Sequence, residues 1–268
     1  NKPEKNIEEV PEEPVYDSEE LLGLVSKDLK TPFDIKEAIA RFSDGSRFEE
    51  FKPLFGSSIV CGWTHVHGYP VAIIGNNGAI YPDSSQKAAH FIQLCNKINT
   101  PIIFLQNVTG FLVGKEFERD GSIKKGSQLI NAVSNSTVPH ITIILGASYG
   151  AGTYAMSGRA FNNRFTFIWP SAKIAVMGGK QIAGVMSLVR RARAMRKGEK
   201  FNEEEDKQIV AAVEKLQEDG SRALEATGLV SDDGIIDPRD TRTVIGMCLS
   251  IVGNKPIKGT KEFGVFRL

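Results

Sequence analysis

Two glycine-rich segments, each directly after a run of apolar residues, are the parts of this sequence best suited to chemistry. Residues 107–111 (NVTGF) follow PIIFLQ, and residues 148–152 (SYGAG) follow HITIIL. Small residues at such points let a ligand approach the backbone, and the first amides of a following helix point toward it. A peptide nest of this kind binds a developing oxyanion without a side-chain acid, and each donor contributes roughly 2.7 to 4 kcal/mol. Tight turns with no ligand explain the same pattern equally well, so the residues alone leave both interpretations open.

Three other segments have weaker chemical signals. Residues 176–180 (VMGGK) form either another backbone surface for a ligand or a plain helix entry. The basic stretch at residues 190–200 could bind the phosphates of CoA or an acidic partner, although a solvated helix face is the better interpretation. Trp169-Pro170 is more typical of a core than of a stacking platform.

Side chains that commonly carry out catalysis do not form a recognisable set. The sequence has no GxSxG elbow, no Walker loop, no HExxH and no GxGxxG after a strand. We interpret the four histidines (His65, His67, His90 and His140) as structural or surface residues. The three cysteines (Cys61, Cys95 and Cys248) lie far apart without metal-ligand spacing, which indicates a reduced compartment and no structural zinc.

The elements that must position the two nests follow from hydrophobic patterning. Residues 101–108 and 140–145 are buried-type strands on either side of a helical stretch at 121–136. Strand, helix and strand form a βαβ unit, so we expect parallel strands and a right-handed crossover. A helix is expected near Ala151, and another strand at 164–169. Residues 59–74 predict a β-hairpin that turns at His67-Gly68.

Several helices surround these strands. A short helix is predicted at 34–42 with Asp34 as its cap, and another begins near 83–85 with a hydroxyl or carboxylate cap. Residues 181–200 and the acidic start at 203–206 predict two helices that form a projecting hairpin. The last helix is expected after Asp237-Pro238, which reads as a cap followed by a first-turn proline.

The amino-acid composition limits the classes of partner that the chain can be expected to bind. The 268 residues, 41% hydrophobic and 24% charged, suit one α/β domain, and a net charge of +1 selects neither nucleic acid nor an anionic membrane. No apolar run or signal-type segment indicates membrane insertion or secretion. Residues 1–20 are acidic and contain three prolines, which is typical of a solvated tether, so we expect the chain to be a piece of a longer polypeptide.

Longer strings resemble the carboxyltransferase β subunits of biotin-dependent acyl-CoA carboxylases. They are FLQNVTGFLVG (104–114), SYGAGTYAMSGRA (148–160), FIWPSAKIAVMGG (167–179) and DDGIIDPRDTR (232–242). The resemblance covers nearly all of residues 20–268. Residues 75–95, the helical insertion between 187 and 220 and the FGVFRL ending are most similar to methylcrotonyl-CoA and geranyl-CoA carboxylases. Lys180 departs from the acidic residue that follows the glycine pair in related enzymes.

The resemblance implies a fold and a domain organisation. The fold is crotonase-like α/β, the repeated ββα superhelix of the ClpP/crotonase class, with a projecting helical hairpin. An acidic linker (1–20) would precede a carboxyl-terminal carboxyltransferase domain (21–268) that has a helical insertion at about 187–220. Such subunits carry two of these domains in tandem, and the carboxyl-terminal one receives biotin. We therefore expect little activity from this chain alone.

The implied reaction is carboxyl transfer from N-carboxybiotin to an acyl-CoA, with 3-methylcrotonyl-CoA as the expected substrate. The backbone amides of Ala151 and Gly152, helped by the turn at Gly150, would stabilise the negative ureido oxygen of biotin. The biotin nitrogen itself would then take the proton of the acyl-CoA, so no histidine base is needed. Further lining is assigned to cofactor contacts at Gly110, Phe111, Gly178 and Gly179, and to substrate contacts at Asn76 and Asn77.

The resemblance also implies partners. Biotin would be carried on a separate biotin carboxylase and carrier (alpha) subunit, not attached to this chain, and the β subunits would self-associate into an oligomer. Acyl-CoA is the expected substrate, and no metal, nucleic acid or membrane is expected. The location would be the cytoplasm of a bacterium or the mitochondrial matrix of a eukaryote.

Three alternatives stay open. A biotin-dependent decarboxylase subunit of the glutaconyl-CoA type runs the same chemistry in reverse. A half subunit could also be an assembly and biotin-docking module without turnover. A hydratase or isomerase of the crotonase class is disfavoured, because those enzymes need positioned carboxylates and no Glu or Asp lies in the two glycine turns.

Overall fold

A seven-stranded mixed sheet forms the centre of the chain. The computed structural model describes residues 10–26, 31, 33–264 and 266. The strand order is β1-β2-β3-β4-β5-β6, and β7 pairs with the last residues of β5. The strands are β1 (Glu49–Glu50), β2 (Ile59–Val66), β3 (Tyr69–Asn76), β4 (Ile102–Val108), β5 (His140–Tyr149), β6 (Phe165–Ile168) and β7 (Lys173–Ala175).

The directions of the strands confirm the predicted hairpin and the predicted parallel pairing. β2 and β3 form an antiparallel hairpin, and its turn residues His67 and Gly68 both have positive φ, as such two-residue turns require. The β3–β4, β4–β5 and β5–β6 pairs are all parallel. The carboxyl ends of β4 and β5 therefore meet at one edge of the sheet, where both predicted nests begin.

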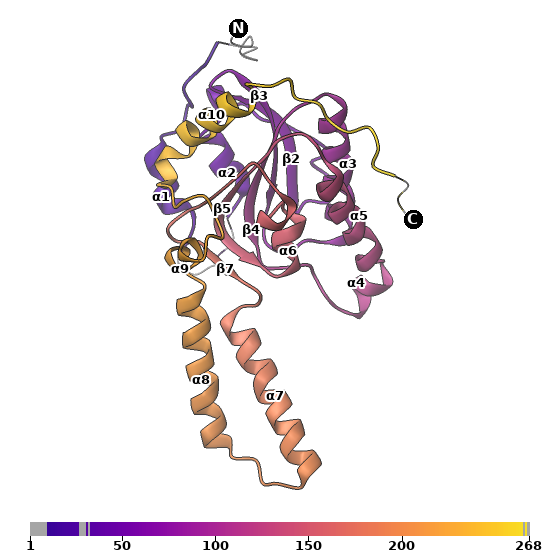
Figure 1. Cartoon of the computed structure of the whole chain (residues 1–268), viewed down its shortest axis with the longest axis vertical. Coiled ribbons are helices and arrows are strands. Elements are labelled where there is room, and N and C mark those ends of the chain that lie inside the picture. The colour runs from indigo at the N-terminus through magenta and orange to yellow at the C-terminus, as the bar shows by residue number, and fades with distance from the viewer. Residues whose placement is uncertain (1–9, 27–30, 32, 265, 267–268) are drawn as a thin grey trace.

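Helices cover both faces of the sheet (Figure 1). The α-helices are α1 (Leu21–Leu24), α2 (Ile35–Ala40), α3 (Pro82–Lys97), α4 (Lys115–Arg119), α5 (Ser122–Asn135), α6 (Ala151–Ala155), α7 (Gly179–Lys197), α8 (Glu203–Gly220), α9 (Ala223–Gly228) and α10 (Thr241–Val252). Short 3-10 helices are η1 (Ser18–Glu20), η2 (Asp44–Ser46), η3 (Arg159–Phe161) and η4 (Pro238–Asp240).

β2, β3 and β4 each contribute to two hydrophobic clusters because their side chains alternate between faces. Ile103 and Leu105 pack with α1, α2 and α10, whereas Ile102 and Phe104 pack with α3 and α5. All seven residues of β4 are buried. Burial on both faces explains why the central strands read as continuous apolar runs. Trp169 lies in the first cluster, as expected, and its indole donates to Thr241.

The helices α7 and α8 form a hairpin that projects away from the sheet (Figure 1). Asn202 caps α8 by accepting from two amides, and four acidic residues occupy its first turn. Near the tip of the hairpin, Arg191 pairs with Glu203 through two hydrogen bonds. The predicted projecting hairpin is therefore confirmed, with the connection between its helices at residues 198–202.

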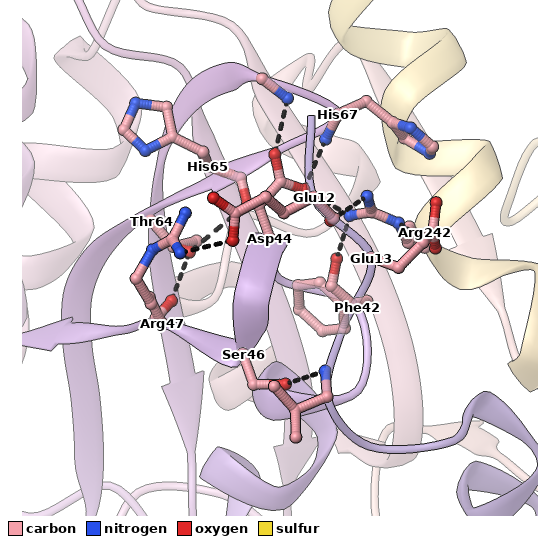
Figure 2. A network of polar contacts seen from close by, with 12 residues as sticks. Glu12, Glu13, Phe42, Asp44, Ser46, Arg47, Thr64, His65, His67 and Arg242 are labelled. Carbon is pink, nitrogen blue, oxygen red and sulfur yellow. Dashed lines mark hydrogen bonds and ion pairs between the residues drawn. The ribbon is translucent and has the colours of Figure 1, made fainter. Parts of the chain in front are cut away.

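Residues 10–20 are bound to the body of the chain, contrary to the expected solvated tether. Arg242 donates to the backbone oxygen of Glu12, and Arg47 pairs with the Glu12 carboxylate (Figure 2). The same Arg242 forms a buried ion pair with Asp44, 2.5 Å between Nη1 and Oδ1. Asp44 also accepts from the backbone amides of His67 and Gly68. Residues 1–9 of the predicted tether lie outside the described residues.

Other details of the helices differ from the sequence predictions. α3 begins at Pro82 after Tyr81, which makes no side-chain cap, so the predicted hydroxyl or carboxylate cap is wrong. Proline suits that first position because its missing N–H would have no partner there. The short elements α4, α9 and β7 escaped prediction because three to six residues give too little periodicity.

The three cysteines are buried and free. Among the described residues, no group of three or more metal-ligating side chains comes together. No described helix has the length and apolar character that crossing a bilayer requires.

Candidate functional site

The three glycine-rich segments predicted from the sequence converge at the carboxyl edge of the parallel strands. A Cβ added to Gly152 would lie 3.4 Å from the Cα of Gly110, which places the first two segments in contact. On the other side, the amide of Gly150 donates to the backbone oxygen of Ala175 at 3.0 Å. A Cβ at Gly150 would lie 3.0 Å from the backbone oxygen of Val176. The segment at 148–152, called the nest from here on, is thus flanked by both others.

The nest presents two backbone amides that have no acceptor among the described residues. Gly150 precedes α6 with φ 55° and ψ −136°, a conformation that favours glycine. Ala151 and Gly152 are the first residues of α6, so their amides have no intrahelical acceptor. Ala151 is exposed, whereas Gly152 is buried. These amides can therefore donate to an anion that enters beside Ala151.

Asn76 and Asn107 brace the strand ends beneath this site. The Asn76 side chain donates to the backbone oxygen of Asn107 at 2.6 Å and accepts from the Asn107 amide at 2.9 Å. The Asn107 side chain in turn accepts from the amide of Ala147 at 3.1 Å, where the β4–β5 register shifts. Asn76 is fully buried, so its observed contacts are internal. Asn77 accepts from the amide of Ile35. Contact between either predicted residue and a substrate stays a prediction.

A second buried network connects β4 to α6. Ser148 donates to the Gln106 side chain at 2.6 Å and shares a hydrogen bond of 2.9 Å with the Thr153 hydroxyl. The Gln106 amide nitrogen donates to the backbone oxygen of Met156 at 2.8 Å. Gln106 and Ser148 are both fully buried. The network therefore contacts the helix that carries the two free amides.

The remaining predicted residues have different surroundings. Phe111 is half-buried and packs against Gly126 of α5. Gly178 lies beside the ring of Tyr149, at the edge of the nest, whereas Gly179 packs against the backbone of Glu214 in α8. Gly178 thus lies closer to the nest than Gly179 does. Gly179 instead allows close packing between the start of α7 and α8.

His140 is a buried structural histidine, not a free base. Its Nδ1 and Nε2 atoms are each 2.8 Å from a hydroxyl, of Ser157 and Ser136 respectively. Burial lowers its pKa to about 4, so the ring is neutral at physiological pH. The interpretation of this histidine as structural is confirmed.

A separate cavity of about 600 Å³ lies at the opposite edge of the sheet. Trp63, Tyr69 and Pro101 line it, beside the end of β2 and the starts of β3 and β4. Because β3 and β4 are parallel, this cavity and the nest are at opposite ends of the strands. The cavity therefore cannot form part of the nest.

The sequence carried a signal for the two bracing networks. Gln106 and Asn107 are polar residues near the end of a strand that is otherwise fully apolar. A polar side chain buried between two covered faces must find hydrogen-bond partners inside the protein. Such a pair predicts an internal network, although pattern alone does not reveal its partners.

Comparisons with known proteins show the family of this chain. The carboxyl transferase domain family matches residues 1–266. The probable biotin-dependent acyl-coenzyme A carboxylase beta2 subunit of Mycobacterium tuberculosis is 58% identical over 257 residues, which are 96% of this chain and 49% of that protein. The mitochondrial methylcrotonoyl-CoA carboxylase beta chain of Dictyostelium discoideum is 46% identical over 96% of this chain and 44% of its own length.

A solved structure gives the same result for the fold. The beta subunit of geranyl-CoA carboxylase from P. aeruginosa matches with a TM-score of 0.85 and 44% identity, over 97% of this chain and 50% of that subunit. The predicted crotonase-like α/β fold is thereby confirmed. The chain spans about half the length of the curated relatives it matches. By sequence and by fold, the chain belongs to the carboxyl transferase domain family of biotin-dependent acyl-CoA carboxylase β subunits.

Proposed function

We propose that this chain is the biotin-receiving half of a carboxyltransferase that transfers a carboxyl group from N-carboxybiotin to an acyl-CoA. The observation that carries the proposal is the pair of free amides at Ala151 and Gly152. They lie where the ends of two parallel strands meet a third glycine-rich segment.

The residues of the nest fit biotin chemically. Biotin, when bound, supplies a ureido group whose oxygen gains negative charge as the carboxyl group leaves. Ala151 and Gly152 would donate to that oxygen from fixed backbone positions, and fixed donors cost little reorganisation during the reaction. Residues 107–111 and 148–152 contain no carboxylate that would repel the developing charge. Gly110 would leave space for the rings of the cofactor, because a Cβ there would have no neighbour within 4 Å. Gly178 would line the edge of the same site.

The proposed acyl-CoA is 3-methylcrotonyl-CoA. Relatives from Dictyostelium discoideum and Arabidopsis thaliana, at 46% and 47% identity, are named methylcrotonoyl-CoA carboxylase beta chains. Geranyl-CoA is the runner-up, because one matching solved structure is the beta subunit of a geranyl-CoA carboxylase. Most of the CoA contacts would come from the amino-terminal half of the subunit.

The proposal includes partners and a location. A separate alpha subunit would carry the biotin. Complete β subunits would assemble into oligomers, by analogy with the hexamer assembly named for the transcarboxylase 12S structure. The location would be the mitochondrial matrix in a eukaryote or the cytoplasm in a bacterium. This half alone would bind its partners with little turnover.

The test joins this chain to the matching amino-terminal half and supplies the biotin-carrying subunit, ATP and bicarbonate. Incorporation of labelled bicarbonate into a panel of acyl-CoAs should be highest for 3-methylcrotonyl-CoA, and the chain alone should give almost none. Preferred carboxylation of propionyl-CoA would contradict the substrate assignment. Sodium-linked decarboxylation without ATP-dependent fixation would contradict the direction.

A further inference from the structure

Helix α6, which carries the two free amides, is too short to hold its own geometry. It contains five residues, Ala151–Ala155, and starts from a glycine in a sparsely populated conformation. Isolated helices become stable only at about 12 to 15 residues, because the first turn fixes several residues for few hydrogen bonds. Groups outside the helix must therefore fix the directions of the Ala151 and Gly152 amides.

One side chain on the neighbouring strand contacts the exit of this helix and a residue of β5 that precedes it. The Gln106 amide nitrogen donates to Met156, the residue after α6, at 2.8 Å, and lies 3.4 Å from the backbone oxygen of Thr153. The Gln106 carbonyl oxygen accepts from Ser148 at 2.6 Å, just before the nest turn. Ser148 also contacts the Thr153 hydroxyl inside the helix at 2.9 Å.

Gln106, Ser148 and Thr153 are called the clamp from here on, and burial makes the clamp rigid. Gln106 and Ser148 are both 0% exposed, so breaking one of these hydrogen bonds leaves a buried polar group without a partner. Gln106 uses its donor and acceptor ends at once, and flipping its amide would place its oxygen against the backbone oxygen of Met156. The side chain consequently has one favourable orientation, and it links Ser148, two residues before Gly150, to the exit of α6.

We propose that Gln106, acting through Ser148 and Thr153, is a positioning residue that aims the amides of Ala151 and Gly152. The inference rests on the proposed function of the nest. Donors stabilise an oxyanion only when they point to the place where its charge develops. A displacement of about 1 Å at such a site can cost about a hundredfold in rate. The clamp would thus affect turnover although none of its side chains contacts the reacting atoms.

Two substitutions at Thr153 separate positioning from packing. Thr153→Val keeps the shape of the side chain and removes the hydroxyl, whereas Thr153→Ser keeps the hydroxyl and removes the methyl group. Gln106→Leu removes both ends of the clamp and is the more severe variant. If Gln106→Leu does not fold, the Thr153 pair still decides the question.

Thr142→Val is the matched control for lost buried hydrogen bonding. Thr142 is fully buried, whereas Thr153 is half-buried. The Thr142 hydroxyl donates to the backbone oxygen of Ser157, two residues after α6, at 2.7 Å and accepts from the Asn163 side chain at 2.9 Å. It contacts neither the nest nor Gln106. This variant should lose at least as much stability as Thr153→Val and leave the nest amides in place.

The experiment measures the dissociation constant of free biotin for the 268-residue chain by calorimetry, and kcat and KM in the enzyme joined to its amino-terminal half. Thr153→Val should lower kcat on the order of tenfold, with KM for the acyl-CoA unchanged and a weaker biotin affinity. Thr153→Ser and Thr142→Val should stay within about twofold of the unmodified enzyme.

Equal kcat and equal biotin affinity for folded Thr153→Val and Gln106→Leu would overturn the positioning role. The positioning role would also be overturned if Thr153→Ser and Thr142→Val lower kcat as Thr153→Val does, each in proportion to its loss of stability. Absence of biotin binding and of carboxylation by the unmodified protein would instead count against the proposed function. The two failures are therefore distinguishable.

Discussion

The backbone of Gly152 lies directly against the side chain of Val108: a Cβ at position 152 would come within 2.4 Å of the Val108 Cγ2 atom. Val108 is the last residue of β4 and is fully buried, so it has little room to move. The contact joins the first turn of α6 to the end of the neighbouring strand. It also means that any side chain at position 152 disturbs packing as well as ligand approach.

Gly152→Ala should therefore destabilise the chain, and Val108→Ala should partly restore it. Overpacking of this kind costs about 1 to 3 kcal/mol, and removing the two methyl groups of Val108 creates space for the new Cβ. Urea unfolding of the two single variants and the double variant gives the coupling energy between the sites. Additive effects of the two substitutions would show that the close approach is not a constraint.

Acid should weaken the fold through His140. The folded state holds the pKa of this ring at about 4, whereas an unfolded histidine titrates near 6.5. Between these values the unfolded chain binds the proton more readily, so stability rises with pH there and is lost as pH falls from about 6.5 toward about 4. The full difference corresponds to about 3 kcal/mol.

His140→Gln should be less stable at neutral pH and should flatten this pH dependence. Its neutral stability falls because the two serine hydroxyls lose their ring partner. Urea midpoints measured at several pH values between 4.5 and 7.5 provide the check. His90→Gln is the comparison, because that ring is exposed and its pKa, also lowered by burial, should give a smaller change in slope. An unchanged slope for His140→Gln would show that His140 does not cause the acid sensitivity.

Arg242→Met should destabilise the chain by about 3 kcal/mol, because it leaves the buried Asp44 carboxylate without its ion pair. The variant also removes the contact that holds the backbone of Glu12, so residues 10–15 should become more susceptible to limited proteolysis. Lys207→Met is the control, since its pair with Glu204 is about three-quarters exposed and should contribute little. A loss below 1 kcal/mol in Arg242→Met would contradict the structural importance of the pair.

Hydrophobic periodicity in the sequence predicted the strands and helices that carry the site. Details such as the full length of β5 depend on tertiary contacts. β4, β5 and α5 follow from apolar runs and helical spacing, and the glycines after the strands indicated the nest. The length of β5 was underestimated, because Gly146 and its neighbours look like a loop. In the structure Gly146 is needed inside the strand: a Cβ there would lie 2.4 Å from the Asn107 side chain.

The polar contacts beneath the nest depend on residues far apart in the sequence. Asn76 meets Asn107, and Gln106 meets Met156, only after three parallel strands are aligned in register. Local propensity contains no information on such pairings. The acidic segment at 10–20 shows the same limit, since its composition predicts a tether while Arg47 and Arg242 bind it to the body.

Amide chemical shifts provide the most direct test of the biotin site. Free biotin is titrated into the isotopically labelled 268-residue chain, and each backbone amide is followed by two-dimensional NMR. The largest shifts should occur at Ala151 and Gly152, with smaller ones at Gly110 and Gly178. Saturating shifts confined to the opposite cavity near Trp63 and Tyr69, with the two nest amides unmoved, would contradict the assignment of biotin to the nest.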